Sequence, residues 1–268
     1  MVVEYQGQFY VLHEDWDTLI NRDDIYDHLR HLLSTMKVDI QGAELIENQL
    51  CTPVGKQEIW ASGVTYYRSR EARIDESKDA GGGDFYDRVY YAERPEIFMK
   101  APGYRAVGHN QNVRIREDSN WNVPEPELTL MISSSGKVIG YTVGNDMSSR
   151  DIEGENPLYL PQAKSYDGST AVGPCILITQ NALSPDTLIS IEILRMDKVV
   201  FNDEIPINQI KRDLEELVGY LYREMSFPHG ALLMTGTGIV PPNEFTLDHG
   251  DEIRITIDGI GTLVNTVE

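Results

Sequence analysis

Apolar residues recur at helical spacing in two segments of the chain. Between residues 23 and 36, one helical face would carry Ile25, Leu29, Leu32, Leu33 and Met36. Between residues 208 and 224, one face would carry Ile210, Leu214, Leu217, Val218 and Leu221. An apolar stripe of this kind is typical of a helix that packs on a core. The pattern therefore predicts helices near 23–36 and 208–224.

Strand-like alternation dominates the chain after residue 105. Leu128, Leu130 and Ile132 alternate with Thr129 and Met131, the turn-forming stretch SSSGK follows, and a second apolar run spans 138–143. Alternation on both sides of such a turn is typical of a β-hairpin. We expect more strands near 9–12, 175–179, 188–195, 198–202, 252–257 and 261–267.

These elements predict an α+β fold that is mainly β. Strands are many, helices are few, and they do not alternate in the βαβ order of a parallel sheet. The length of 268 residues allows one large or two modest domains. Because the composition changes near residue 56, we expect a small amino-terminal domain at 1–58 and a larger catalytic domain at 59–268.

Composition and charge exclude several classes of protein. With 41% hydrophobic residues the chain can bury a core, and its net charge of −20 argues against nucleic acid or anionic membrane as a partner. Cys51 and Cys175 form no CxxC motif, which argues against a disulfide framework. No signal peptide or apolar run of about 20 residues is evident. We expect a cytoplasmic protein.

Two carboxylates stand at the start of the predicted hairpin, in the stretch NVPEPELTLM. Glu125 and Glu127 are two residues apart, so on a strand both side chains point to the same face. Folding the hairpin about Ser135 places Asn145 and Asp146 beside Glu125, since cross-strand neighbours lie about 5 Å apart. Three carboxylates would then converge.

Carboxylates this close need a cation between them if all are to stay ionised. A hard divalent ion with oxygen ligands meets this need, and we expect Mg²⁺, with Mn²⁺ or Ca²⁺ as alternatives. From spacing alone, the other interpretation is a solvated acidic strand end.

Positive side chains follow in a segment with little apolar content, 140–174. Arg150 lies four residues beyond Asp146, and Lys164 lies 18 beyond it. Together they could bind an anionic substrate beside a metal, and a nearby divalent ion would favour the neutral amine that a lysine base requires. The alternative for Lys164 is an ordinary surface lysine.

Three consecutive glycines, Gly81, Gly82 and Gly83, suggest a mobile loop or lid. They do not form a P-loop, because no lysine followed by serine or threonine comes after them. His28 and His31 are spaced for a metal, but no third ligand is evident, and we interpret them as surface residues.

Several motifs, in order, resemble the fumarylacetoacetate hydrolase superfamily from about residue 60 to the end. They are PEPEL, GYTVGNDMSSRD, AKSYDG with VGP, and TGTGIVPP with LDHGDEIRITIDGIGTLVN. Within that superfamily, GVTYYRSREAR, PEIFMK and ENPLYLPQAKSY are most similar to the dehydratases of 2-keto-3-deoxy sugar acids. Those enzymes act on substrates such as 2-keto-3-deoxy-D-arabinonate and give 2,5-dioxopentanoate.

The resemblance implies a mixed β-roll fold with a small amino-terminal domain, a homodimer or homotetramer, and a small-molecule 2-keto acid substrate. It assigns the divalent metal to Glu125, Glu127 and Asp146, and it makes Lys164 the active-site lysine. Glu96, in PEIFMK, is the candidate for the acid that protonates the departing hydroxyl.

Two further residues are candidates for substrate binding. Thr237, in TGTGIV, is expected to line the pocket, with a structural turn as the alternative. Arg150 is expected to contact substrate, and the alternative is that it pairs with Asp151 or a glutamate and braces the loop.

One departure from the family pattern bears on the reaction. Ser69 stands where the hydrolases of the superfamily have a histidine that activates water for C–C cleavage. The sequence therefore favours a metal-dependent dehydratase. The alternative is a hydrolase or decarboxylase of an acylpyruvate-like 2-keto acid.

Overall fold

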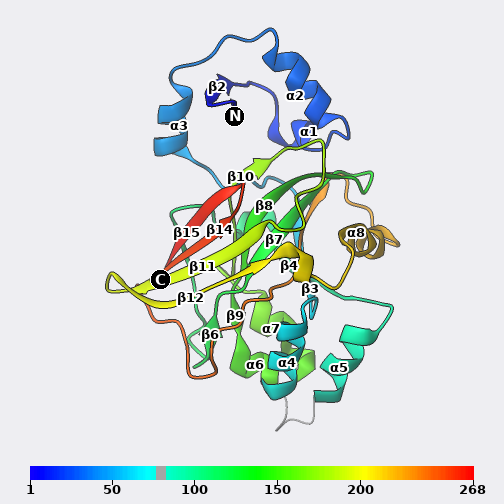
Figure 1. Cartoon of the computed structure of the whole chain (residues 1–268), viewed down its shortest axis with the longest axis vertical. Coiled ribbons are helices and arrows are strands. Elements are labelled where there is room, and N and C mark those ends of the chain that lie inside the picture. Colours follow the sequence, from blue (N-terminus) through cyan, green and yellow to red (C-terminus); the bar gives the residue numbers. More distant parts are fainter. Residues whose placement is uncertain (77–82) are drawn as a thin grey trace.

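Two β-sheets form the body of the chain in the computed structural model, which describes residues 1–76 and 83–268 (Figure 1). The larger sheet has the order β10-β8-β7-β13-β3-β4. Its strands are β3 (Glu58–Gly63), β4 (Glu96–Pro102), β7 (Pro126–Ile132), β8 (Val138–Asp146), β10 (Thr170–Leu177) and β13 (Ala231–Met234). The β13–β3 pair is parallel, and the other neighbours are antiparallel.

The smaller sheet has the order β12-β11-β14-β15-β5 and packs against one face of the larger. Its strands are β5 (Gln111–Val113), β11 (Leu188–Arg195), β12 (Lys198–Pro206), β14 (Glu252–Ile257) and β15 (Gly261–Val267). Leu128 and Leu130 of β7 share one core with Ile191 of β11 and Ile255 of β14, all buried. This core holds the two sheets together by the burial of apolar surface.

The opposite face of the larger sheet is covered by the amino-terminal segment. It contains β1 (Val2–Tyr5), β2 (Gln8–Val11), α1 (Trp16–Leu19), α2 (Ile25–Leu33) and α3 (Gly42–Gln49). Leu19 and Ile25 share a second core with Met131 of β7 and Leu232 of β13. Successive residues of β7 thus serve two cores, which explains why all of β7 is buried.

Helices gather at the other end of the body, away from the amino-terminal segment (Figure 1). They are α4 (Tyr67–Glu76), α5 (Gly83–Tyr91), α6 (Arg150–Glu155) and α7 (Leu160–Lys164). The pair β6 (Asn122–Val123) and β9 (Ser148–Ser149) lies near them, and α8 (Leu214–Tyr222) lies to one side. Single 3₁₀ turns occur at Gly103–Arg105, Pro157–Tyr159 and Ile207–Gln209. Side chains of α4, α6 and α7 contact Glu125, just before β7, or Asp146, at the end of β8.

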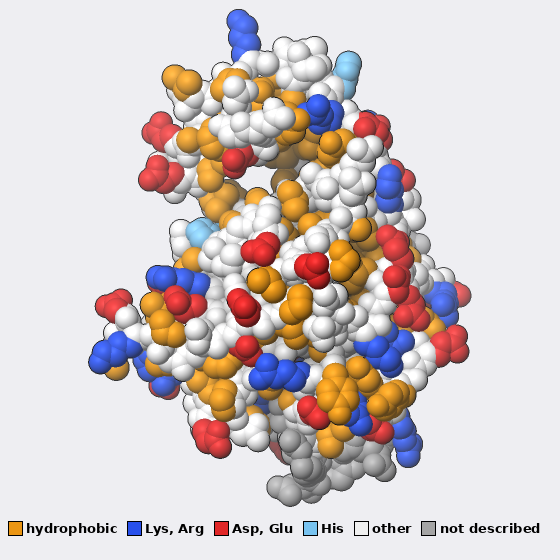
Figure 2. Space-filling model, in the orientation of Figure 1, with side chains coloured by type: hydrophobic (Ala, Val, Ile, Leu, Met, Phe, Trp, Pro, Cys, Tyr) orange, Lys and Arg blue, Asp and Glu red, His pale blue; other side chains and the backbone are white. Residues whose placement is uncertain are grey.

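The surface matches the acidic composition. Acidic side chains are spread over the face drawn in Figure 2 and do not collect in one patch. Within the described residues, no helix combines the length and apolar character needed to cross a membrane.

Most predicted elements are confirmed, including the mainly β α+β fold and the 128–143 hairpin. The strand expected at 175–179 begins earlier, at Thr170, because its first residues pair with the end of β8. The strand expected at 198–202 continues to Pro206. Of the predicted glycine lid, Gly81 and Gly82 lie outside the described residues, and Gly83 begins α5.

The helix predicted at 208–224 is wrong at its start. Residues 207–209 form a 3₁₀ turn, and α8 begins at Leu214. The Lys211 amide donates to the Thr65 carbonyl, 2.9 Å away, so this segment bonds to another part of the chain. Asp213 then caps α8 by accepting a hydrogen bond from the Glu216 amide at 3.0 Å.

Whether replacing Asp213 with alanine lowers or raises the stability of the protein depends on where the helix begins. Asp213→Ala should destabilise the protein by about 1 kcal/mol, because an amide of the first turn loses its partner. Were Asp213 inside a helix from residue 208, alanine would stabilise it by up to about 0.7 kcal/mol. Urea unfolding followed by circular dichroism distinguishes the two, with the exposed Gln209→Ala as a control that should change little.

Candidate active site

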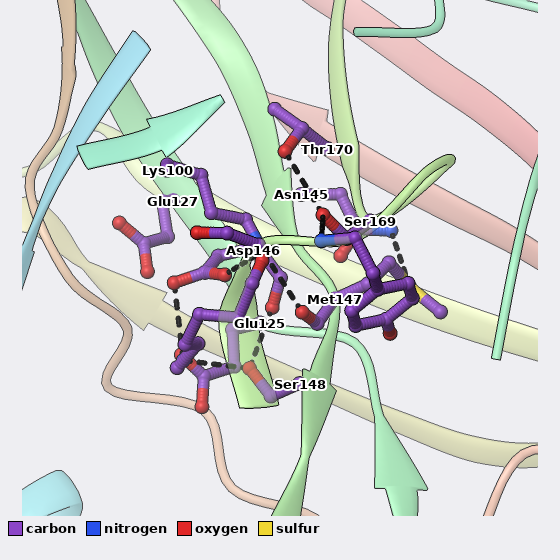
Figure 3. A network of polar contacts seen from close by, with 12 residues as sticks. Lys100, Glu125, Glu127, Asn145, Asp146, Met147, Ser148, Ser169 and Thr170 are labelled. Carbon is purple, nitrogen blue, oxygen red and sulfur yellow. Dashed lines mark hydrogen bonds and ion pairs between the residues drawn. The ribbon is translucent and has the colours of Figure 1, made fainter. Parts of the chain in front are cut away.

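Three carboxylates meet where β7 begins and β8 ends. Glu125 precedes β7, Glu127 lies in it, and Asp146 is the last residue of β8. The Asp146 amide donates to the Glu125 carbonyl at 3.0 Å, which fixes the two residues side by side. One oxygen from each of the three carboxylates lies within 4.8 Å of the others, and all three residues are buried (Figure 3).

The hairpin register explains this meeting. Pro126 pairs with Asn145 and Glu127 pairs with Gly144, so Glu125 and Asp146 are next in line. Their side chains point to the face that carries Met131 further along β7, away from the smaller sheet. The structure therefore brings Glu125, Glu127 and Asp146 together, as expected from folding the hairpin about Ser135.

Glu125 is surrounded by positive groups. Its Oε1 accepts from Arg73 at 3.0 Å and from Arg150 at 2.9 Å, and its Oε2 accepts from Lys164 at 2.7 Å. Burial would raise the pKa of Glu125, but the charges of Lys164, Arg73 and Arg150 outweigh it and hold the pKa well below its usual range. Glu125 therefore stays ionised.

Glu127 has a different environment. Its Oε2 accepts a hydrogen bond from the Gly236 amide at 2.6 Å. Burial, together with the negative charges of Asp146 and Glu125, raises the pKa of Glu127 well above its usual value. A bound cation would remove this penalty, because it would stabilise the ionised form.

Asp146 lies between two lysines. Lys100 Nζ is 2.6 Å from Asp146 Oδ1, and Lys164 Nζ is 3.1 Å from Asp146 Oδ2. Lys100 is fully buried and also donates to the Met147 carbonyl at 2.9 Å and to the Lys164 carbonyl. It therefore ties the end of β8 to the end of α7.

A β-bulge places Lys100. Ile59 of β3 pairs with Ala101 of β4, but the next residue, Trp60, pairs with Met99, so Lys100 is the extra residue. Bulges redirect side chains and are frequent beside functional sites. Burial lowers the pKa of Lys100, and the nearby Asp146 opposes that shift.

Lys164 ends the short helix α7 and points into the carboxylates. Besides Glu125 and Asp146, its Nζ contacts Ser148 Oγ at 2.6 Å, and the residue is 2% exposed. The surface alternative for Lys164 is therefore wrong. An amine held by several fixed partners is well placed to act on a substrate in the adjoining pocket.

A pocket opens beside these groups. It is lined by Ser62, Gly63, Val64, Ser69, Arg73, Glu96, Phe98, Glu125, Glu127, Asp146, Glu153, Lys164, Gly236 and Thr237. Glu96 is half-buried at the start of β4. Burial raises the pKa of Glu96, although the charges of Arg73 and Lys164 partly oppose that shift.

The predicted residues divide into two groups. Glu96, Thr237, Lys164 and the three carboxylates line the pocket, but Arg150 is not among its lining residues. Arg150 is buried and contacts Glu125, which matches the alternative that it pairs with a glutamate.

Ser69 does line the pocket, but its hydroxyl is used locally. It donates to the Tyr66 carbonyl at 2.8 Å and accepts from the Tyr66 amide at 3.2 Å. All six histidines lie among the described residues, and none of them lines the pocket.

Sequence reasoning missed Arg73, Lys100 and Glu153. Arg73 of α4 contacts both Glu125 and Glu153 of α6, so its role depends on how two distant helices dock. Lys100 is the extra residue of the β4 bulge, which a regular two-residue strand period does not predict.

The donor set fits a hard divalent cation. Three buried carboxylates converge within 4.8 Å, and Mg²⁺ is commonly held by a few carboxylates together with water and substrate oxygens. Burial and the charges of Asp146 and Glu125 raise the pKa of Glu127, and a divalent cation bound among the three carboxylates would favour its ionised form.

Comparison with known proteins gives close relatives. A protein of Haloferax volcanii named probable 2-keto-3-deoxyxylonate dehydratase is 44% identical over 87% of this chain and 80% of its own length. The 2-dehydro-3-deoxy-D-arabinonate dehydratase of Saccharolobus solfataricus is 40% identical over 85% of this chain and 78% of its own length.

A solved structure agrees with these relatives. The structure of 2-keto-3-deoxy-D-arabinonate dehydratase complexed with magnesium and 2,5-dioxopentanoate superposes with a TM-score of 0.84 at 35% identity. The match covers 100% of this chain and 94% of that one. The family model for the C-terminal region of fumarylacetoacetate (FAA) hydrolase matches residues 64–268, which include every residue of the pocket except Ser62 and Gly63. The family expected from the motifs is thus confirmed, and the chain belongs to the fumarylacetoacetate hydrolase family.

Proposed function

We propose that this chain is a magnesium-dependent dehydratase of a 2-keto-3-deoxy sugar acid. The proposed substrate is of the type of 2-keto-3-deoxy-D-arabinonate, and the product is 2,5-dioxopentanoate. The observation that carries the proposal is the buried Lys164 amine beside three carboxylates, in a pocket that also holds Glu96. The names of the two relatives and the ligands of the similar structure support it.

Glu125, Glu127 and Asp146 are proposed to hold Mg²⁺, with Mn²⁺ or Ca²⁺ as alternatives. When bound there, the ion would polarise the 2-keto group of the substrate and make its C3 proton more acidic. Arg73 and Arg150 keep Glu125 ionised and oriented, since both contact its Oε1.

Lys164 is proposed to remove the C3 proton. The Ser148 hydroxyl and the two carboxylates around Nζ fix its position. Lys100 donates a hydrogen bond to the Lys164 backbone carbonyl and also pairs with Asp146. These contacts help to keep a constant separation between the Lys164 amine and Asp146. A general base requires fixed geometry and also a neutral amine, and a divalent ion bound to Glu125 and Asp146 would favour the neutral amine.

Glu96 is proposed to protonate the C4 hydroxyl as it leaves. A carboxyl whose pKa is raised keeps its proton to a higher pH than an ordinary glutamate, so it can act as an acid. Loss of the C3 proton to Lys164 and of the C4 hydroxyl as water gives a C3=C4 double bond conjugated to the 2-keto group. Loss of a C5 proton and protonation at C3 then give the C4=C5 enol, and its tautomerisation, with protonation at C4, gives the aldehyde at C5.

Thr237 is proposed to line the substrate site, as its place in the pocket supports. Hydrolysis is less well supported, because a histidine that would activate water is replaced by Ser69, whose hydroxyl bonds to Tyr66. We also propose residues 1–58 as the small domain and 59–268 as the catalytic domain. The homodimer or homotetramer and the cytoplasmic location stay predictions.

Product analysis tests the reaction. Incubation with a panel of 2-keto-3-deoxy pentonates and hexonates should give loss of water in proton NMR spectra. EDTA should slow it by at least about 100-fold, because metal polarisation contributes several kcal/mol, and added Mg²⁺ should restore it.

Acylpyruvates serve as the comparison substrates in the same spectra. Cleavage of their C–C bond without dehydration of any keto-deoxy acid would replace this proposal with the hydrolase alternative. Dehydration that persists at full rate in EDTA would remove the metal from the mechanism.

The lysine is tested by Lys164→Ala. This variant should lower kcat by about 10²–10⁴-fold, because general base catalysis contributes that much. Its circular dichroism spectrum should be unchanged, and calorimetry should still detect Mg²⁺ binding.

Lys198→Ala is the matched control, since Lys198 is an exposed lysine of β12. It should retain wild-type turnover. Full turnover in Lys164→Ala would exclude Lys164 as the base.

A further inference from the structure

Glycine at position 63 leaves room that the Glu96 carboxyl fills. The register of β3 and β4 pairs Gly63 with Glu96, so a side chain at 63 would stand beside that of Glu96. A Cβ atom built on Gly63 would lie 2.3 Å from Glu96 Oε2 and 2.7 Å from Glu96 Cδ. Atoms cannot approach this closely, so the carboxyl lies where a side chain would otherwise be.

Backbone conformation does not explain this glycine. Gly63 is not among the residues with positive φ, so alanine could adopt its conformation. A glycine within a strand costs conformational entropy and often marks the close approach of another group. Here the approaching group is a side-chain carboxyl.

Hydrogen bonds to β3 hold the Glu96 backbone in place. The Ser62 hydroxyl donates to the Glu96 carbonyl at 2.9 Å, and strand pairing fixes the rest of the peptide. A side chain at position 63 would therefore move the end of the Glu96 side chain and leave the strand where it is. That end is flexible, so the displacement costs little stability.

The missing side chain at Gly63 determines the direction in which the Glu96 carboxyl points. Gly63 and Glu96 both line the pocket, together with Lys164 and Phe98. Since Glu96 lies across the glycine, its carboxyl shares the pocket with Lys164 Nζ, whose charge affects it. The space at residue 63 would thus set the position of the proposed acid, Glu96, relative to the proposed base, Lys164.

We propose that Gly63 is a positioning residue, whose missing side chain directs the Glu96 carboxyl into the pocket to serve as the acid. The proposal rests on the proposed function, in which Glu96 protonates the leaving hydroxyl. It assigns no contact with substrate to Gly63 itself.

The test is Gly63→Ala, alone and combined with Glu96→Gln. The single Gly63→Ala change should lower kcat by at least about tenfold, since small displacements of catalytic groups have large effects, while KM changes less than about twofold. In the Glu96→Gln background, where no acid remains to be displaced, the same change should have almost no further effect on kcat. Gly219→Ala is the control, because a Cβ at Gly219 meets no atom within 4 Å and the residue lies on α8.

A crystal structure of Gly63→Ala gives a readout that does not depend on activity. The Glu96 carboxyl should have left its place beside residue 63, with β3 and β4 unchanged. An unmoved carboxyl would overturn the inference. A rise in KM that persists in the Glu96→Gln background would also overturn it, because Gly63 would then make room for substrate. Absence of dehydration in the wild type would instead refute the proposed function, whatever the crystal structure shows.

Discussion

Burial of like charges is the constraint on which this structure depends. Glu125, Glu127 and Asp146 lie within 4.8 Å of one another in the interior, and such a group is stable only when positive charge is close to it. Four cationic side chains approach two of the acids, and Glu127 receives only an amide hydrogen bond among the contacts described. The remaining need for positive charge is what a divalent ion would meet.

Meeting this constraint requires parts of the fold that are far apart in sequence. The β7–β8 hairpin supplies the acids, the bulged edge strand β4 supplies Lys100, and helices α4, α6 and α7 supply Arg73, Arg150 and Lys164. The same strand β4 presents Glu96 to the pocket. The face of the larger sheet that carries the acids is apolar further along, where the amino-terminal segment covers it. One sheet face therefore serves both as a core and as a site.

Local patterns predicted the hairpin and the meeting of its acids, because alternation and turn residues determine a hairpin register almost alone. They did not predict Arg73, whose contacts arise from packing between α4 and α6. The apolar spacing from Ile210 to Leu221 indicated one continuous helix. The helix begins only at Leu214, because the Asp213 side chain caps it by accepting a hydrogen bond from the Glu216 amide. Lys100 was missed because a β-bulge inserts it into β4, and its full burial depends on tertiary contacts.

Titration calorimetry with MgCl₂, without substrate, tests whether the three carboxylates bind a metal ion. We expect a single Mg²⁺ ion bound per chain, with binding lost in Asp146→Asn, which keeps the shape of the side chain and removes a ligand charge. Asp186→Asn, an exposed aspartate away from the site, is the control and should bind as the wild type does. Equal Mg²⁺ binding by the wild type and Asp146→Asn would contradict the assignment of the metal to these three carboxylates.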